Sequence, residues 1–184
     1  MKISDVIYLC AVKLNREYIN GVSSGTSSYN DGTEVKSVLG KLVLCVANEL
    51  SSMGYYVVKE EEIDGILGYI DYSSLSLPLT KVLSVKDEQG KECDWKCLID
   101  RVEVDHSAKK LVYAYELSSK SDVEEIEFAN KSITQNLIAT GVCAEYLLTL
   151  SDFEGAIHWR SKFDSMLKDI KFPKNVICKE RSFE

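Results

Sequence analysis

The N-terminal third of the chain spaces its apolar residues three or four positions apart, which is the period of an amphipathic helix. Within residues 4–20 these positions are Ile7, Ala11, Leu14 and Tyr18. Ser4 is the expected N-cap, and Asp5 suits the positive end of the helix dipole. Gly21 is the expected stop, so the spacing predicts a first helix over residues 4–20.

A second helix is predicted from about Glu34 to Ser52, with Asp31 or Thr33 as its cap. Its buried stripe comprises Val35, Leu39, Leu42, Val46 and Leu50. Residues 22–33, VSSGTSSYNDGT, lie between the two helices and are rich in turn formers, which predicts a long polar loop.

The middle of the chain changes to short segments separated by turns every 8–12 residues, as in all-β regions. The expected strands are 55–58, 69–72, 80–85, 92–98, 101–104 and 110–117, with a further one over 125–128. Such segments predict an antiparallel meander or small barrel.

Helical spacing returns after residue 129. Asn130 or Ser132 is expected to cap a helix to about Leu150, and Ser151-Asp152 breaks it. The next helix is predicted over Phe153–Ile170. The apolar positions are Ile133, Leu137, Gly141, Ala144 and Leu148 in the first of these helices, and Ala156, Trp159, Phe163, Met166 and Ile170 in the second. A break this short predicts an antiparallel helix hairpin.

The pattern therefore predicts an α+β fold in four parts. N-terminal helices with their loop occupy 1–54, an inserted antiparallel β lobe occupies 55–128, and the hairpin of 129–170 packs on the N-terminal helices. Residues 171–184 form a tail. Trp159 and Phe163 are expected to fill the hairpin seam, so truncating a buried Trp159 would cost roughly 3–5 kcal/mol.

Composition narrows the class of protein. The chain has 184 residues and a net charge of −7, and 45% of its residues are hydrophobic. This composition is ordinary for one globular domain. We expect no membrane span and no export signal, because the sequence has no apolar stretch of the required length and no cleavage site. The acidic balance argues against non-specific binding to nucleic acid. The tail differs in charge from the rest of the chain. Its four basic and two acidic residues give it a net charge of +2, whereas residues 1–170 have a net charge of −9.

The six cysteines are expected to be free thiols in a reducing compartment. Cys93 and Cys97 are close together, but zinc sites usually repeat such a pair or add histidines at helix spacing. If they lie in a strand, Cys93, Trp95 and Cys97 share one apolar face. A redox or metal pair is the alternative.

Catalytic patterns are absent from the sequence. The two histidines, His106 in a turn and His158 on the last helix, are expected at the surface. No G-x-S-x-G elbow or phosphate loop occurs. The acidic runs at 60–64 and 122–127 are interpreted as solvated faces, with a weak divalent-ion site as the alternative. We expect no enzyme and no cofactor.

The segment ATGVCAEYLLTLSDFEGAIHWRSKFDSML, residues 139–167, resembles the C-terminal hairpin of the head-to-tail adaptors of tailed bacteriophages, also called tail tubular protein A or head-completion connectors. The resemblance rests on Ala144, Glu145 and Tyr146 in one helix. In the next helix it rests on Glu154, Ala156, Trp159 and Phe163. The order of the elements along the rest of the chain is similar as well.

This resemblance implies a structural virion protein at the head–tail interface, present in the host cytoplasm during assembly. Its copies would form a ring, commonly of twelve, under the portal protein. The ring would extend the channel through which DNA passes, without sequence-specific binding, and would offer a docking surface to tail proteins. The tail would bind the portal or a neighbouring copy through Phe172, Pro173, Lys174, Val176, Ile177, Lys179, Arg181 and Phe183.

Two other hypotheses remain at this point. One is a different non-catalytic protein, either another capsid–tail joining component or a small protein-binding module. The other is an enzyme that uses the acids at 60–64 or the Cys93–Cys97 pair.

Overall fold

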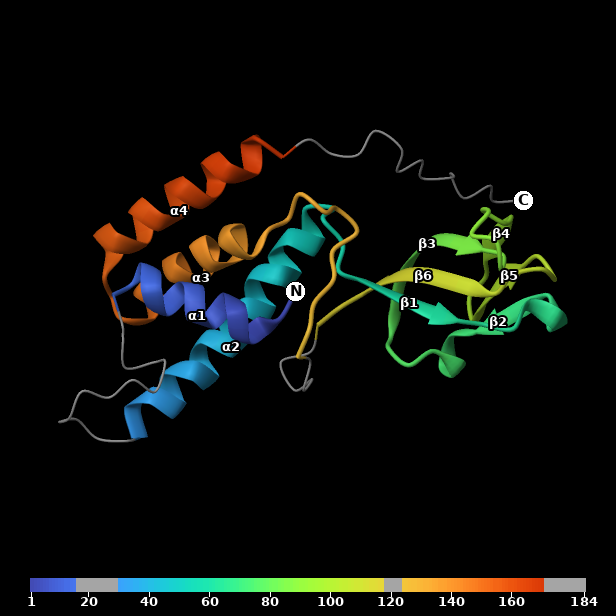
Figure 1. Ribbon diagram of the computed structural model, residues 1–184, viewed down its shortest axis with the longest axis horizontal. Coiled ribbons are helices and arrows are strands. Elements are labelled where there is room, and N and C mark those ends of the chain that lie inside the picture. Colours follow the sequence, from blue (N-terminus) through green and yellow to red (C-terminus); the bar gives the residue numbers. More distant parts are fainter. Residues whose placement is uncertain (16–29, 118–123, 171–184) are drawn as a thin grey trace.

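The computed structural model describes residues 1–15, 30–117 and 124–170, with only the backbone of 30–33. The helices are α1 (Ile3–Lys13), α2 (Asn30–Ser52), α3 (Gln135–Thr149) and α4 (Phe153–Lys168). The strands are β1 (Val58–Glu62), β2 (Tyr69–Asp71), β3 (Leu79–Lys86), β4 (Trp95–Cys97), β5 (Arg101–Val104) and β6 (Lys110–Tyr115). Short 3₁₀ helices, η2 (Gly65–Leu67) and η3 (Tyr72–Ser74), flank β2. The predicted α+β class is confirmed, and Figure 1 shows the helices and the strands in separate halves of an elongated molecule.

α3 is the central helix of the helical half. It packs against α1, α2 and α4, and every residue from Leu137 to Ala144 is buried. A helix that is apolar on all sides must be surrounded by other elements. α2 carries Leu39, Val43 and Val46 into the same core.

The helix boundaries differ from those predicted. α1 ends at Lys13, well before Gly21, because Asn15 adopts a left-handed backbone (φ 54°) and the chain leaves the helix there. Its N-cap is Lys2 instead of Ser4, and Asp5 does lie in the first turn. α2 begins at Asn30, so Asp31 and Thr33 lie inside the helix. The predicted loop therefore loses residues 30–33, and its remainder lies outside the described residues.

The caps of α3 and α4 come from residues next to each helix. The Leu137 N–H donates to Thr134 Oγ1 (3.2 Å), and the Gly155 N–H donates to Asp152 Oδ1 (3.0 Å). Asn130 and Ser132 are therefore not the cap of α3. Asn130 instead forms a turn before the helix by accepting a bond from the Ser132 N–H.

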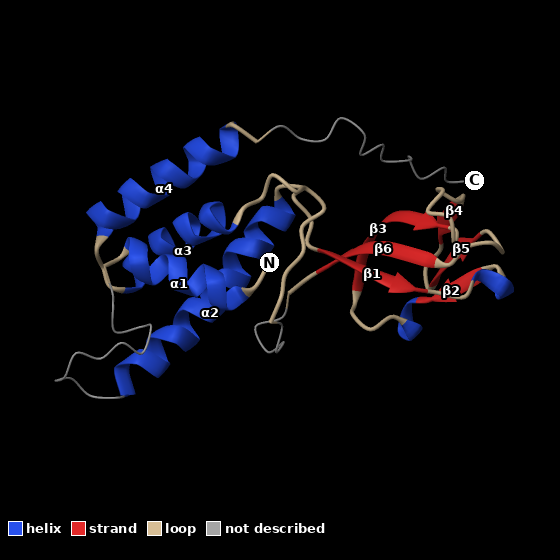
Figure 2. Cartoon of the chain, in the orientation of Figure 1, coloured by secondary structure: helices blue, strands red, loops and turns tan. Residues whose placement is uncertain are grey.

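The strands form two three-stranded antiparallel sheets, ordered β1-β6-β3 and β2-β5-β4 (Figure 2). Because β6 pairs with β1 and β3, which precede it by many residues, the predicted meander is wrong, and the strands do not close into one barrel sheet. β1 begins at Val58 and contains Glu60, Glu61 and Glu62, so the acidic run is part of a strand. The strand expected over 125–128 is reduced to isolated bridges to Lys2 and Val57.

Residues 124–133 join the two halves. The Ile3 N–H donates to Glu124 O (2.9 Å), the Ile126 N–H to Met1 O (2.8 Å) and the Val58 N–H to Glu127 O (2.8 Å). The apolar core continues through this segment at Ile126, Phe128 and Ile133. The two halves therefore share one buried core. No helix in the described ranges is long and apolar enough to cross a membrane.

Candidate interaction surface

The seam between α3 and α4 depends on small residues of both helices. Ala144 and Ala156 are buried, as are Tyr146 and Phe163. A Cβ atom at Gly141 would lie 2.9 Å from Phe163 Cε2 and 3.0 Å from Val46 Cγ1. Only a residue without a side chain lets α3 approach α2 and α4 this closely.

Trp159 occupies a different position from the one predicted. It is half-buried at the rim of the seam, where Lys13 Nζ and Lys162 Nζ lie 5.2 Å and 5.1 Å from the centre of its ring. The seam is filled by the fully buried Phe163. Because part of Trp159 stays in contact with solvent, we assign the expected loss of roughly 3–5 kcal/mol on truncation to Phe163 instead.

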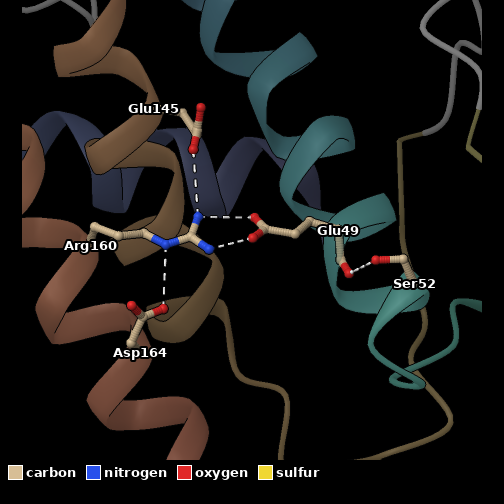
Figure 3. Close-up of polar contacts among 5 residues, drawn as sticks. All are labelled: Glu49, Ser52, Glu145, Arg160 and Asp164. Carbon is tan, nitrogen blue, oxygen red and sulfur yellow. Dashed lines mark hydrogen bonds and ion pairs between the residues drawn. The ribbon is translucent and has the colours of Figure 1, made fainter.

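Arg160 ties three helices together (Figure 3). Its Nη1 lies 3.2 Å from Glu49 Oε2 of α2 and 3.6 Å from Glu145 Oε1 of α3, and its Nε lies 3.3 Å from Asp164 Oδ1 one turn further along α4. The paired bonds to Glu49 engage both Nη atoms, and chiefly through these bonds the Arg160 pKa rises above its ordinary value. This arrangement fixes the orientation of α4 on α2 and α3.

An apolar surface lies at the end of this rigid unit, around the turn between α3 and α4. Leu148 and Leu150 are 45% and 48% exposed, and Phe153 and Ile157 are 63% and 69% exposed. Phe153 and Ile157 are one turn apart on α4, so they share a face. Apolar groups gathered and left in water in this way mark surfaces that contact another molecule. We call Leu148, Leu150, Phe153 and Ile157 the turn patch.

A second apolar group lies on the β half. Ile66 and Leu67 of η2 are 65% and 69% exposed, next to the end of β5 at Val104. Ile99 is fully exposed in the turn between β4 and β5, at the other end of β5. In Figure 1 the α3–α4 turn and the β2–β5 region lie at opposite ends of the long axis. We call Ile66 and Leu67 the lobe patch.

The other candidate residues are dispersed. His106 is exposed in a turn with its Nδ1 3.0 Å from Ile66 O, and His158 is exposed on α4. Cys93 is half-buried and Cys97 is exposed, so the strand face expected to be apolar is partly open to solvent. Among the described residues, no group of three or more His, Cys, Asp or Glu is placed to hold a metal ion.

The acidic run of β1 contacts neighbouring lysines. Lys110 Nζ lies 3.0 Å from Glu60 Oε1, and this bond and the lysine charge hold the pKa of Glu60 below its ordinary value. Lys109 Nζ lies 3.3 Å from Asp64 Oδ1. These are exposed ion pairs, as on a solvated face.

The five described cysteines are free thiols, as expected. Cys10 is fully buried, and its Sγ lies 3.6 Å from Ala139 O. A hydrogen bond with Cys143, together with burial, raises the pKa of Cys10, which makes it an unreactive core thiol.

Two features of this surface were missed at the sequence level. Phe153 and Ile157 lie outside the predicted apolar stripe of their helix. Apolar residues off the buried stripe could have indicated an exposed apolar surface. The role of Arg160 had no such signal, because Glu49 is 111 residues away. The eight partner-binding residues expected between Phe172 and Phe183 lie outside the described residues.

A comparison of the chain with known proteins finds no matching family model and no matching curated protein.

Proposed function

We propose that this chain is a ring-forming head-to-tail adaptor that binds beneath a phage portal. In this proposal it extends the DNA channel and offers a docking surface to tail proteins. The observation that carries the proposal is the turn patch, because it lies within the very segment that resembles the adaptor hairpin. A surface held by three helices and the Arg160 cluster is suited to repeated, identical contacts.

The position of the two patches favours a ring in particular. A contact between two different surfaces of one chain is heterologous, and it closes into a ring when the rotation between copies permits. The turn patch and the lobe patch are different apolar surfaces at separate ends of the molecule. The net charge of −7 suits a channel that does not retain passing DNA.

The adaptor proposal expects a portal gene beside the gene of this chain, and the test is co-assembly with that portal protein. We expect the purified chain and portal to elute together from a sizing column at a fixed stoichiometry, and light scattering to give the copy number. Images of the complex should place the turn patch at an interface.

A matched pair of variants sharpens this test. Ile157→Asp places a charge in the turn patch and should weaken co-assembly at least tenfold without loss of folding. Val38→Asp, at an exposed apolar position of α2, should leave co-assembly unchanged. If the folded native chain never forms a stoichiometric complex with the portal, the adaptor proposal is wrong, and a joining or binding module with another partner replaces it.

A further inference from the structure

A groove of about 700 Å³ opens where β1 and residues 124–133 diverge. Val58 and Glu60 of β1 form part of one wall, and Glu124–Phe128 form another. Tyr115 and Leu77 supply apolar surface between them. The groove is separate from both apolar patches described above.

The outer edge of β1 faces this region with its backbone unpaired. β1 is the outermost strand of its sheet. The Tyr115 N–H donates to Val57 O and the Ile63 N–H donates to Lys109 O, so the odd-numbered residues of β1 point their backbone groups at β6. Val58, Glu60 and Glu62 therefore point theirs outward.

Of the three outward-pointing residues, only Val58 has a backbone hydrogen-bond partner on the outer edge of β1. The Val58 N–H donates to Glu127 O at 2.8 Å. Beyond it, no strand of the described ranges lies along Glu60 and Glu62. An edge of this kind accepts an added strand through its main-chain donors and acceptors.

Asn130 supplies a second sign that the groove takes a ligand. The residue is 9% exposed and lines the groove. Its Oδ1 accepts from the Ser132 N–H, but its Nδ2 has no acceptor among the described residues. An unpaired buried amide is costly, and a small shift of the Asn130 side chain on peptide docking would bring its Nδ2 to a peptide carbonyl.

The charge of the groove selects a basic ligand. Glu60, Glu124, Glu125 and Glu127 line it, against Lys59 and Lys131. Glu127 pairs with Lys131, and Glu60 pairs with Lys110. Glu124 and Glu125 are exposed and form no ion pair with any described residue. Cross-strand pairs of opposite charge stabilise an added strand.

We propose that the basic tail of this chain, residues 171–184, occupies the groove. In the docked state residues 174–179 add to the outer edge of β1 as a strand. KNVICK places β-branched Val176 and Ile177 between two lysines, so apolar and basic side chains would meet the apolar and acidic walls. Pro173 lacks an N–H and lies just outside the strand.

The tail that fills the groove comes from the same chain or from a neighbouring copy. When residues 174–179 are docked, residues 171–173 connect them to Ile170, so Lys174 lies within about 13 Å of Ile170. This inference does not depend on the adaptor proposal, because the groove and its occupant are both parts of this protein and no portal is involved.

Hydrogen exchange of the full chain tests the added strand. In the native chain the Glu60 and Glu62 amides should exchange at least tenfold more slowly than in a Val176→Pro/Ile177→Pro variant, since proline cannot complete the ladder. Ser182→Pro, outside residues 174–179, should preserve the slow exchange. Equal rates in the native and double-proline chains overturn the proposal, provided that amides of α3 exchange equally in both.

Cross-linking tests the charge pairing and identifies the source of the tail. A carbodiimide that joins lysine to carboxylate should link Lys174 or Lys179 to Glu124 or Glu125, and should link them to the exposed Glu88 at least tenfold less. In an equal mixture of ¹⁴N- and ¹⁵N-labelled chains, links of mixed mass identify a neighbouring copy, and links of single mass identify the same chain. No enrichment over Glu88 refutes the docking, whereas a portal complex that still forms leaves the adaptor proposal standing.

Discussion

Single residues control how closely the helices approach one another. Phe163 is fully buried in the seam between α3 and α4, and Gly141 leaves the space that its ring occupies. Trp159, one turn earlier on α4, covers the rim and lies near two lysine ammonium groups. The two aromatic residues therefore differ in what they contribute to stability.

Phe163→Ala should lower the free energy of unfolding by about 3–5 kcal/mol, as expected for a buried aromatic residue that leaves a cavity. Trp159→Ala should cost only about 1–2 kcal/mol, because a half-buried side chain loses less contact. Urea denaturation of both variants measures the two losses. A larger loss for Trp159→Ala would show that the rim, and not Phe163, holds the seam.

Gly141→Ala should be destabilising, because the added methyl group would press on Phe163 and Val46, and overpacking of a core costs about 1–3 kcal/mol. Gly40→Ala is the matched control. Its Cβ atom would meet nothing closer than Ile7 Cδ1 at 4.0 Å. It should therefore stabilise α2 by about 0.5–1 kcal/mol through helix propensity. In thermal unfolding, Gly141→Ala should lower the melting temperature and Gly40→Ala should raise it. Changes of the same sign in both variants would contradict the close approach at Gly141.

At the scale of elements, the orientation of α4 depends on polar contacts that no local pattern specifies. Arg160 lies on α4, and Glu49 and Glu145 reach it from α2 and α3. Phe153 and Ile157 share a side of α4 with Arg160 and Asp164, since these positions are four, three and four residues apart. The contacts that Arg160 makes therefore also fix the direction in which Phe153 and Ile157 point.

Arg160→Met keeps most of the side-chain volume but leaves three carboxylates close together. We expect a loss of about 1–2 kcal/mol, since exposed pairs contribute up to about 1 kcal/mol each and these groups are partly exposed. Lys131→Met removes a single exposed pair with Glu127 and should change stability by less than about 0.5 kcal/mol. Denaturation at low and high salt measures this loss, which should be smaller at high salt. A loss of stability that does not depend on salt would argue for packing instead of charge.

At the scale of the whole molecule, one core joins two halves of different secondary structure. Ile126, Phe128 and Ile133 carry it across, and Asn48 of α2 holds Leu117 through two hydrogen bonds, from Nδ2 to Leu117 O (2.8 Å) and from the Leu117 N–H to Oδ1 (3.1 Å). Elements that share buried contacts tend to unfold together.

Phe128→Ala should therefore destabilise both halves equally, by about 3–5 kcal/mol. Native-state hydrogen exchange should show the slowest amides of α3 and of β6 accelerated by the same factor. Ile99→Ala, at a fully exposed position, should change neither. Acceleration confined to β6 would show that the halves unfold independently.

Local pattern predicted the helices and several strands well, and their ends poorly. β3 at Leu79–Lys86 and β5 at Arg101–Val104 match the expected strands closely, because β-branched residues flanked by turn formers specify extended backbone locally. The end of α1 at Lys13 did not follow from the pattern, since helical spacing continues past it to Tyr18. The acidic residues of β1 gave no apolar alternation, so pairing with β6 decided that strand.

The sequence by itself determined the α+β class, the short break between α3 and α4 and the small residues that let these helices meet. These properties depend on neighbouring residues and on helical period, which are local. Only the tertiary structure decided the strand order, the contacts of Arg160, the exposed position of Phe153 and Ile157, and the open edge of β1. Each of these depends on which distant segments pack together, and that choice is made by burial of the whole core.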